Sequence, residues 1–449
     1  MHWRRGAGCV VLLMQWLARA EPSYFRDVQP ILQKNCVGCH QPAMLSSGLD
    51  LTTYDRFRAG GKRGPVFIAG SPSESLLLRF LTGEIKPAMP LGAPPLPKSE
   101  VDLLAEWIKA GAHDDSPRES AANEPTVYRQ PPVITSLRFS PDGKILAVGG
   151  NREILLHDMT GGALVKRLPG KAERILSLSF SADGSLLVAG GGTPARFGEL
   201  QFWDTKTATL TRSVLVCNDT VFGGSLSPDG TKVAVGCTDN SVHVFETSSG
   251  RELYKMSSHE NWVLATVFGV DSKRFVSVGR DRAAKLVDAG TGQFLENVNQ
   301  LRGELSAVAR HPRQDLIVIG GDDRIPYIYT MDRTRNMKVG EESTLVRKLD
   351  PQDGAILALD WSSDGKRIAV AGAGSSANLY DAESGAKVGS CQGQTADVYI
   401  VQFSPDGSLL ATGGFDGKVR IYNTSDCGMR RAMFPVPLTE GPSGDGGKP

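Results

Sequence analysis

The residues with the most distinctive chemistry lie near the N-terminus, in the segment QKNCVGCHQP at residues 33–42. It places Cys36, Cys39 and His40 in a C-x-x-C-H arrangement. Two thiols at this spacing can anchor the vinyl groups of a haem while the adjacent imidazole ligates its iron, so the pattern is typical of c-type haem attachment. We therefore predict one covalent haem c, attached at Cys36 and Cys39, with His40 as the proximal iron ligand.

Two other uses of a C-x-x-C pair fit the surrounding sequence less well. A zinc site needs a second pair of ligands at a suitable spacing, and none follows Cys36 and Cys39. A thioredoxin-like motif needs βαβ surroundings, which the flanking residues do not predict. We retain haem attachment as the prediction.

The distal iron ligand has to come from a residue that can reach the opposite face of the haem. Met44 is only four residues beyond His40, which is too close. Met89 lies in the Pro-flanked segment IKPAMPLG well downstream, whereas the alternative, His113, stands beside two aspartates where we expect it to be solvated. We predict Met89 as the distal ligand. A thioether raises the iron potential relative to two imidazoles, and a filled sixth position indicates electron transfer and not substrate binding.

Three helices are predicted to position these residues, over 21–35, 71–83 and 97–112, because apolar residues recur there at helical spacing. Ser23 is the expected N-cap of the first helix, and Gly83 is the expected end of the second. The order of helix, C-x-x-C-H, long loop, helix, Met loop and helix is that of a small class I cytochrome c.

Several blocks between residues 23 and 113 resemble the planctomycete-type cytochrome c domain of exported proteins. They are FRDVQPILQKNCVGCH, GLDLTTYDRF, GPVFIAGSPSESLLLRFL, AMP and EVDLLAEWIKAGA, in that order. The resemblance implies haem attachment at Cys36 and Cys39, His40 as the proximal ligand and Met89 as the distal ligand.

Residues 1–20 are predicted to be a signal peptide, with a positive start, a short apolar run and an Ala18-Arg19-Ala20 cleavage signal. The apolar run is shorter than the ~20 residues that span a bilayer. Cys9 precedes this run instead of following it, which argues against a lipoprotein anchor. We expect cleavage after Ala20, export to the periplasm and no integral membrane segment in the mature chain. Haem thioethers are made outside the cytoplasm in bacteria, so export and the C-x-x-C-H motif support each other.

The remainder of the chain is a series of repeats. Turn signals of the Ser-Pro-Asp-Gly type recur at intervals near 43 residues, with two weaker copies among them, which makes seven repeats over residues 131–435. Periods of about 40–45 residues indicate four-stranded propeller blades. The third strand of each repeat is predicted to end at a residue pair, and these pairs are His157-Asp158, Trp203-Asp204, Phe245-Glu246, Val287-Asp288, Tyr329-Thr330, Tyr380-Asp381 and Tyr422-Asn423.

These repeats resemble the WD-repeat family, although one blade alone keeps the literal Trp-Asp pair. The Gly-His dipeptide of that family is mostly missing, and Ser258-His259 with Asp281 is its nearest copy. The fold expected for the whole chain is multidomain: a signal peptide (1–20), a small all-α class I cytochrome c domain (21–113), a linker (114–130), an all-β seven-bladed WD-repeat-type propeller (131–435) and a disordered tail (436–449).

The composition limits the partners. Lys and Arg total 50 and Asp and Glu total 49, giving a net charge of +1, so no nucleic-acid partner is expected. Four cysteines in the repeats form disulfides or remain as buried thiols, and the sequence leaves both open: Cys217, Cys237, Cys391 and Cys427.

The propeller sequence predicts no active site. Its four histidines, His157, His243, His259 and His311, fall in separate blades, and no metal cluster or nucleophile–base set is apparent. We therefore expect an electron carrier and not an enzyme: a single-electron-transfer cytochrome whose propeller docks an unidentified protein redox partner. An oxidoreductase whose propeller binds a substrate or second cofactor is the alternative. In a third interpretation, the haem domain is a sensor or structural module.

Overall fold

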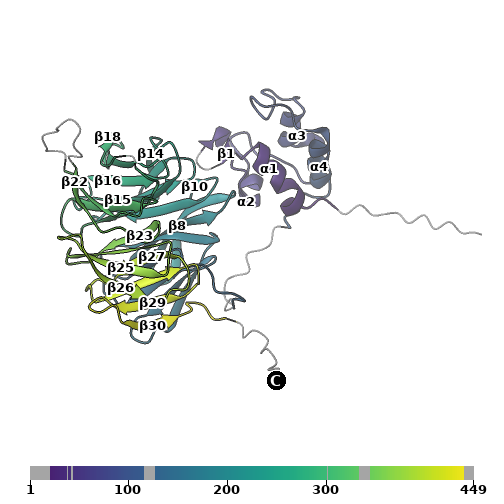
Figure 1. Cartoon of the computed structure of the whole chain (residues 1–449). Helices are drawn as coiled ribbons and strands as arrows, with labels where there is room; N and C mark the ends of the chain where they lie inside the picture. The colour runs from purple at the N-terminus through teal and green to yellow at the C-terminus, as the bar shows by residue number, and fades with distance from the viewer. Residues whose placement is uncertain are drawn as a thin grey trace, which may run out of the picture. The chain divides into compact units, whose positions relative to one another are not determined.

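The chain forms two compact units, one within residues 1–123 and the other within 124–449 (Figure 1). The computed structural model describes residues 21–37, 39–41, 44–115, 127–300, 302–332 and 344–438. The predicted signal peptide, residues 116–126 of the predicted linker and residues 439–449 of the predicted tail lie outside the described residues.

The N-terminal unit is small and partly helical. Its helical elements and its one short ladder are η1 (Tyr24–Val28), α1 (Gln29–Asn35), β1 (His40–Gln41), β2 (Met44–Leu45), η2 (Ser46–Gly48), α2 (Tyr54–Ala59), η3 (Pro72–Glu74), α3 (Leu76–Leu81) and α4 (Lys98–Lys109). Helical residues lie in all three predicted segments, but Ser75, with an extended backbone, divides the second into η3 and α3. Ser23 caps the first because its Oγ accepts the Arg26 N–H at 2.9 Å. The structure adds α2 and the β1–β2 ladder to the predicted loop, since six residues are too few to show helical periodicity.

The core of this unit is built on α4. Its apolar face buries Leu104, Trp107 and Ile108, as the helical spacing predicts. Trp107 stacks on Phe57 with ring centroids 6.0 Å apart, and the Tyr24 ring lies 5.6 Å from Trp107. None of the helices in the described part of the chain is long and apolar enough to cross a bilayer.

The second unit is a ring of seven four-stranded antiparallel sheets, each formed by four consecutive strands. The first strands of the blades are β3 (Leu137–Phe139), β7 (Arg174–Phe180), β11 (Val221–Leu226), β15 (Val263–Phe268), β19 (Leu305–Arg310), β23 (Ile356–Trp361) and β27 (Val398–Phe403). The second strands are β4 (Ile145–Gly149), β8 (Leu186–Thr193), β12 (Lys232–Cys237), β16 (Arg274–Gly279), β20 (Leu316–Gly321), β24 (Arg367–Gly372) and β28 (Leu409–Gly414).

The third strands are β5 (Glu153–Asp158), β9 (Phe197–Asp204), β13 (Val242–Glu246), β17 (Ala284–Asp288), β21 (Tyr327–Thr330), β25 (Ser376–Asp381) and β29 (Val419–Asn423). The fourth strands are β6 (Leu164–Pro169), β10 (Thr209–Cys217), β14 (Glu252–Met256), β18 (Phe294–Asn297), β22 (Leu345–Lys348), β26 (Lys387–Gln392) and β30 (Met429–Met433). In each of the seven blades, the third strand ends at the residue pair that the sequence predicts. The seven-bladed propeller is therefore confirmed.

The ring is closed by contacts between the first strands of neighbouring blades, including β27 of the last blade against β3 of the first. A closed ring leaves no inner sheet edge exposed. The second and third strands are buried along most of their length, whereas most residues of the fourth strands are exposed or half-buried.

The ends of the propeller meet at the first blade. The Tyr128 N–H donates to the Pro437 carbonyl at 3.0 Å, and Tyr128 forms a parallel bridge with Leu438. Val436 is 4 % exposed, and the Tyr128 hydroxyl donates to Glu153 Oε1 at 2.6 Å. Residues 436–438, placed in the tail by the sequence, therefore pack onto the propeller, because a buried aromatic and an apolar pair hold them there.

The four propeller cysteines divide into two pairs with different chemistry. Cys391 in β26 and Cys427 after β29 form a disulfide that links the sixth and seventh blades. Cys217 and Cys237 are free thiols.

Candidate functional site

The C-x-x-C-H residues lie at the C-terminal end of α1, where the helix turns into the β1–β2 ladder. The Cys36 N–H donates to the Leu32 carbonyl at 2.8 Å and so completes the last turn of the helix. The N–H groups of Cys39 and His40 both donate to the Cys36 carbonyl, at 3.1 Å. Because the Cys36 carbonyl accepts both hydrogen bonds, Cys36, Cys39 and His40 are held in one tight turn.

The imidazole of His40 is oriented by the turn that follows it. His40 Nδ1 lies 3.1 Å from the Ser46 carbonyl oxygen. A carbonyl oxygen can only accept, so this contact places the ring proton on Nδ1 and leaves the lone pair on Nε2. An imidazole fixed in this way by a backbone carbonyl is the arrangement of a histidine metal ligand.

Both thiols of the motif are free in the described structure, with Cys39 exposed and Cys36 half-buried. Burial, with smaller contributions from Glu100 and Cys39, raises the pKa of the Cys36 thiol to about 11. Cys36 is therefore a neutral thiol at neutral pH.

Met89 lies on the loop after α3. Its N–H donates to the Phe80 carbonyl at 3.1 Å. Its side chain is half-buried and packs against the same hydrophobic core as Cys36. His113, the alternative distal ligand, is exposed at the end of the unit, as its acidic neighbours suggest. Cys36 and Met89 pack against one core, and together with Cys39 and the oriented imidazole of His40 they offer the types of donor that a covalently bound haem needs.

The histidines of the propeller have structural partners. His259 Nδ1 lies 2.9 Å from Asp281 Oδ2, and its Nε2 lies 2.7 Å from Ser277 Oγ. This network brings together His259 and Asp281, the two residues that the sequence pairs as the nearest copy of the family's motif. His157 Nε2 lies 3.1 Å from the Pro435 carbonyl, and the His311 ring lies edge-on to Trp361 with centroids 4.9 Å apart.

His243 belongs to a cluster that the sequence prediction missed. Cys237, Asp239 and His243 each offer one ligand atom within 4.8 Å of the others. The prediction considered the histidines blade by blade and the cysteines separately, so it did not join them. The signal was the segment CTDNSVH, a short hairpin that brings Cys237 and His243 to one face of the third blade.

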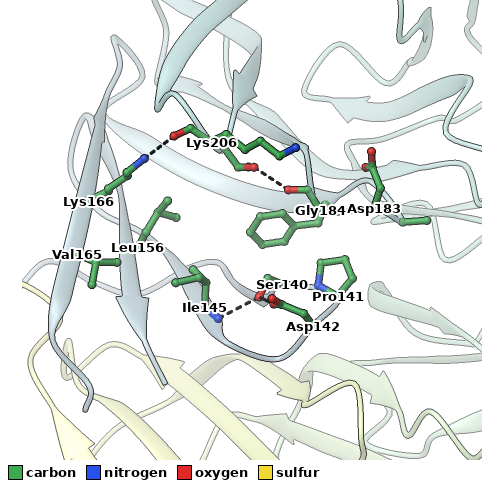
Figure 2. Close-up of a pocket in the computed structure, with 13 residues that line it drawn as sticks. Ser140, Pro141, Asp142, Ile145, Leu156, Val165, Lys166, Asp183, Gly184 and Lys206 are labelled. Carbon is green, nitrogen blue, oxygen red and sulfur yellow. Dashed lines mark hydrogen bonds between the residues drawn. The ribbon is translucent and has the colours of Figure 1, made fainter. Parts of the chain in front are cut away.

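A cavity of about 620 Å³ lies between the first and second blades. Its apolar wall includes Ile145, Leu156 and Phe180, and two lysines stand at its rim (Figure 2). Lys166 Nζ donates to the Lys206 carbonyl at 2.7 Å across the cavity. The lining also includes Ser140 and Asp142, whose side chains hydrogen-bond to each other at 2.6 Å within a hairpin turn.

Comparisons with known proteins agree with this division of the chain. The family model described as "WD domain, G-beta repeat" matches residues 126–158, 162–193, 343–381 and 385–423. The model described as "Planctomycete cytochrome C" matches residues 36–90, which include the C-x-x-C-H turn and Met89.

The similar curated proteins match the propeller. "Serine-threonine kinase receptor-associated protein" from Homo sapiens is 25% identical over 266 residues, covering 51% of this chain and 73% of that protein. The Bos taurus protein of the same name matches equally well. "Autophagy-related protein 16" from Arabidopsis thaliana is 24% identical over 237 residues, covering 50% of this chain and 43% of its own length. Four stretches of this chain therefore match WD40 repeats, and they lie within its seven-bladed propeller.

Proposed function

We propose that this protein is an exported monohaem c-type cytochrome that transfers single electrons and whose propeller docks its protein partner. One observation carries the proposal: the C-x-x-C-H turn presents His40 with Nδ1 bound to the Ser46 carbonyl and Nε2 available. A covalently attached haem would supply an iron that cycles between the ferrous and ferric states.

Each residue of the turn has a separate task in this proposal. Cys36 and Cys39 attach the haem through thioethers, and His40 binds the iron from the proximal side. Met89 binds from the distal side, and the bond from its N–H to Phe80 fixes the loop that carries it. A haem held by both His40 and Met89 would supply electron-transfer chemistry, with no position left open for a substrate.

The propeller's role as a docking platform is supported by its WD40 repeats and by the apolar cavity between its first two blades. A similar human protein is named as associated with a receptor kinase, which is consistent with a propeller that binds a protein. A tethered docking module raises the effective concentration of a weakly binding redox partner around the haem.

Export to the periplasm, with cleavage after Ala20, is part of the proposal. The disulfide between Cys391 and Cys427 supports it, because structural disulfides persist in oxidising compartments.

The test is expression of the full chain in a bacterial host that exports it and attaches c-type haem. We expect haem that stays bound to the chain after denaturation, at one per chain, with a low-spin spectrum. A Cys36→Ser/Cys39→Ser variant is the matched control and should be exported without covalent haem. A protein that matures without haem contradicts the proposal. Binding of carbon monoxide to the reduced protein, or a second chromophore, would instead favour an oxidoreductase.

A further inference from the structure

The third propeller blade contains a group of metal-binding side chains that the electron-transfer proposal does not use. Cys237 ends β12, Asp239 lies in the turn that follows, and His243 lies in β13. One donor atom from each lies within 4.8 Å of the other two. In a tetrahedral zinc site, donors lie about 2.0–2.3 Å from the ion, so a small inward movement of these side chains would bring all three into contact with one ion.

Hairpin geometry explains why the three meet. His243 pairs with Val235 in the β12–β13 register, and Cys237 is two residues further along β12. Residues two apart on a strand point to the same face. Cys237 and His243 therefore share a face of the hairpin, and Asp239 closes it at the turn.

The imidazole of His243 is already oriented as a ligand. Its Nδ1 lies 2.8 Å from Glu252 Oε1 in β14. Its Nε2 lies 2.8 Å from Ser241 Oγ and 3.7 Å from Asp239 Oδ2, so that an ion bound at Nε2 would replace the contact with Ser241. A carboxylate behind a histidine fixes the tautomer and ring direction in zinc sites, and Glu252 holds that position here.

A fourth donor is adjacent. Cys217, at the end of β10 in the second blade, is a free thiol that packs in the same buried cluster as Cys237. Its Sγ now donates to the Asp219 carbonyl at 3.0 Å, a bond that ligation would replace. The fourth blade has a histidine at the corresponding position. His259 lies 22 residues before Asp281, as Cys217 lies 22 residues before Asp239.

We propose that Cys217, Cys237, Asp239 and His243 bind one zinc ion that joins the second and third blades. Two thiols with an imidazole select a borderline-soft ion such as Zn²⁺ over Mg²⁺ or Ca²⁺, which prefer oxygen ligands. The site is structural because all four coordination positions are filled by the protein.

The positive charge of Lys255 opposes binding of a cation, so its removal provides a test with a predicted direction. Lys255 Nζ lies 2.7 Å from Asp239 Oδ2, so it competes for the same carboxylate. Removing this cation should strengthen zinc binding, because two positive charges no longer share one carboxylate. If the Lys255–Asp239 ion pair only stabilises the fold, removing Lys255 should not increase the affinity for zinc.

The experiment measures zinc in the haem-loaded full chain by elemental analysis after equilibration with zinc chloride and dialysis. We expect one zinc per chain, retained in a Cys36→Ser/Cys39→Ser variant and lost in Cys237→Ser and His243→Gln. The Glu252→Gln variant should bind zinc about 10–100-fold more weakly, and Lys255→Gln should bind it more tightly. A zinc content that follows Cys36 and Cys39, or that survives Cys237→Ser, overturns the site.

Alkylation of the unmutated protein tests the site without relying on a variant that must fold. Zinc should protect Cys217 and Cys237 from iodoacetamide, and chelation should expose both, as read by peptide mass spectrometry. A disulfide between Cys217 and Cys237 in the isolated protein, or equal labelling with and without zinc, contradicts the proposal.

Discussion

At the scale of single residues, the two units use histidine in opposite ways. His40 has one nitrogen held by a backbone carbonyl and the other available, which suits an iron ligand. His259 has both nitrogens engaged by Asp281 and Ser277, which suits a structural network. Between these two histidines, the difference lies in how many ring nitrogens have a hydrogen-bond partner.

The distal ligand gives the first prediction. Replacing Met89 by Ala should abolish the thioether-to-iron absorption band and lower the midpoint potential, because the thioether is what raises it. The measurement is visible spectroscopy with a redox titration. His113→Ala is the matched control and should keep the band. Loss of the band in His113→Ala, or its survival in Met89→Ala, would reverse the assignment.

The His259 network gives the second prediction. Asp281→Ala leaves His259 Nδ1 and the Glu260 N–H without their buried acceptor, so the free energy of unfolding should fall by about 1–3 kcal/mol. Urea denaturation of the full chain measures it. Glu260→Ala removes an exposed side chain but keeps that N–H, and should change stability little. Equal losses in the two variants would show that the network contributes nothing.

At the scale of elements, the hairpin turn between the first two strands is the repeating device of the propeller. In the first blade the Ser140 hydroxyl donates to Asp142 Oδ1 at 2.6 Å, and Ser140 Oγ accepts the Ile145 N–H at 2.9 Å. Gly143 completes the turn at φ +72°, a conformation that favours glycine. The same serine–aspartate bond recurs at Asp183, Asp229, Asp364 and Asp406.

These turns predict an acid-sensitive propeller. Hydrogen bonds from Ser181 and Ser185 lower the pKa of Asp183 to about 2. A carboxylate with a lowered folded-state pKa stabilises the fold above its unfolded pKa, and this stability is lost as the pH falls towards the folded value. The free energy of unfolding should therefore decline between about pH 4 and about pH 2.

A pH series of urea denaturation measures this decline. The Asp183→Asn variant should lose less stability on acidification than the unmutated protein, because Asn does not titrate. Asp426→Asn, at an exposed aspartate outside these turns, should leave the pH dependence unchanged. An identical acid response in all three proteins would show that the Asp183 turn does not contribute to it.

These local turns are also why the propeller was predictable from sequence. Serine, aspartate and glycine determine five of the seven turns within four residues, and the regular spacing of these five turns located the two weaker repeats between them. The Cys237–His243 cluster depends instead on the strand register and on Cys217 from a neighbouring blade. The short helix α2 lacks the length to show a period, and the exposure of Met89 or Cys36 depends on packing that no local pattern records.

At the scale of the whole molecule, neighbouring blades are joined by more than apolar contacts. The disulfide links two cysteines that are 36 positions apart in the sequence, and it joins the last two blades. A Cys391→Ala/Cys427→Ala variant should lose about 2–4 kcal/mol in free energy of unfolding, because its unfolded chain is less restricted. Urea denaturation with and without reductant measures the loss. Reductant should destabilise the unmutated protein and not the variant; equal sensitivity would contradict this.

The meeting of Tyr128 and Leu438 on the first blade has a further consequence for engineering. Because the two ends of the propeller lie side by side, a short linker can join them and new ends can be opened at any exposed turn between blades. Such circular permutants should fold into the same ring. The propeller then becomes a scaffold on which the N-terminal unit can be attached at each blade in turn, so that the dependence of electron transfer on the position of the tether can be measured directly.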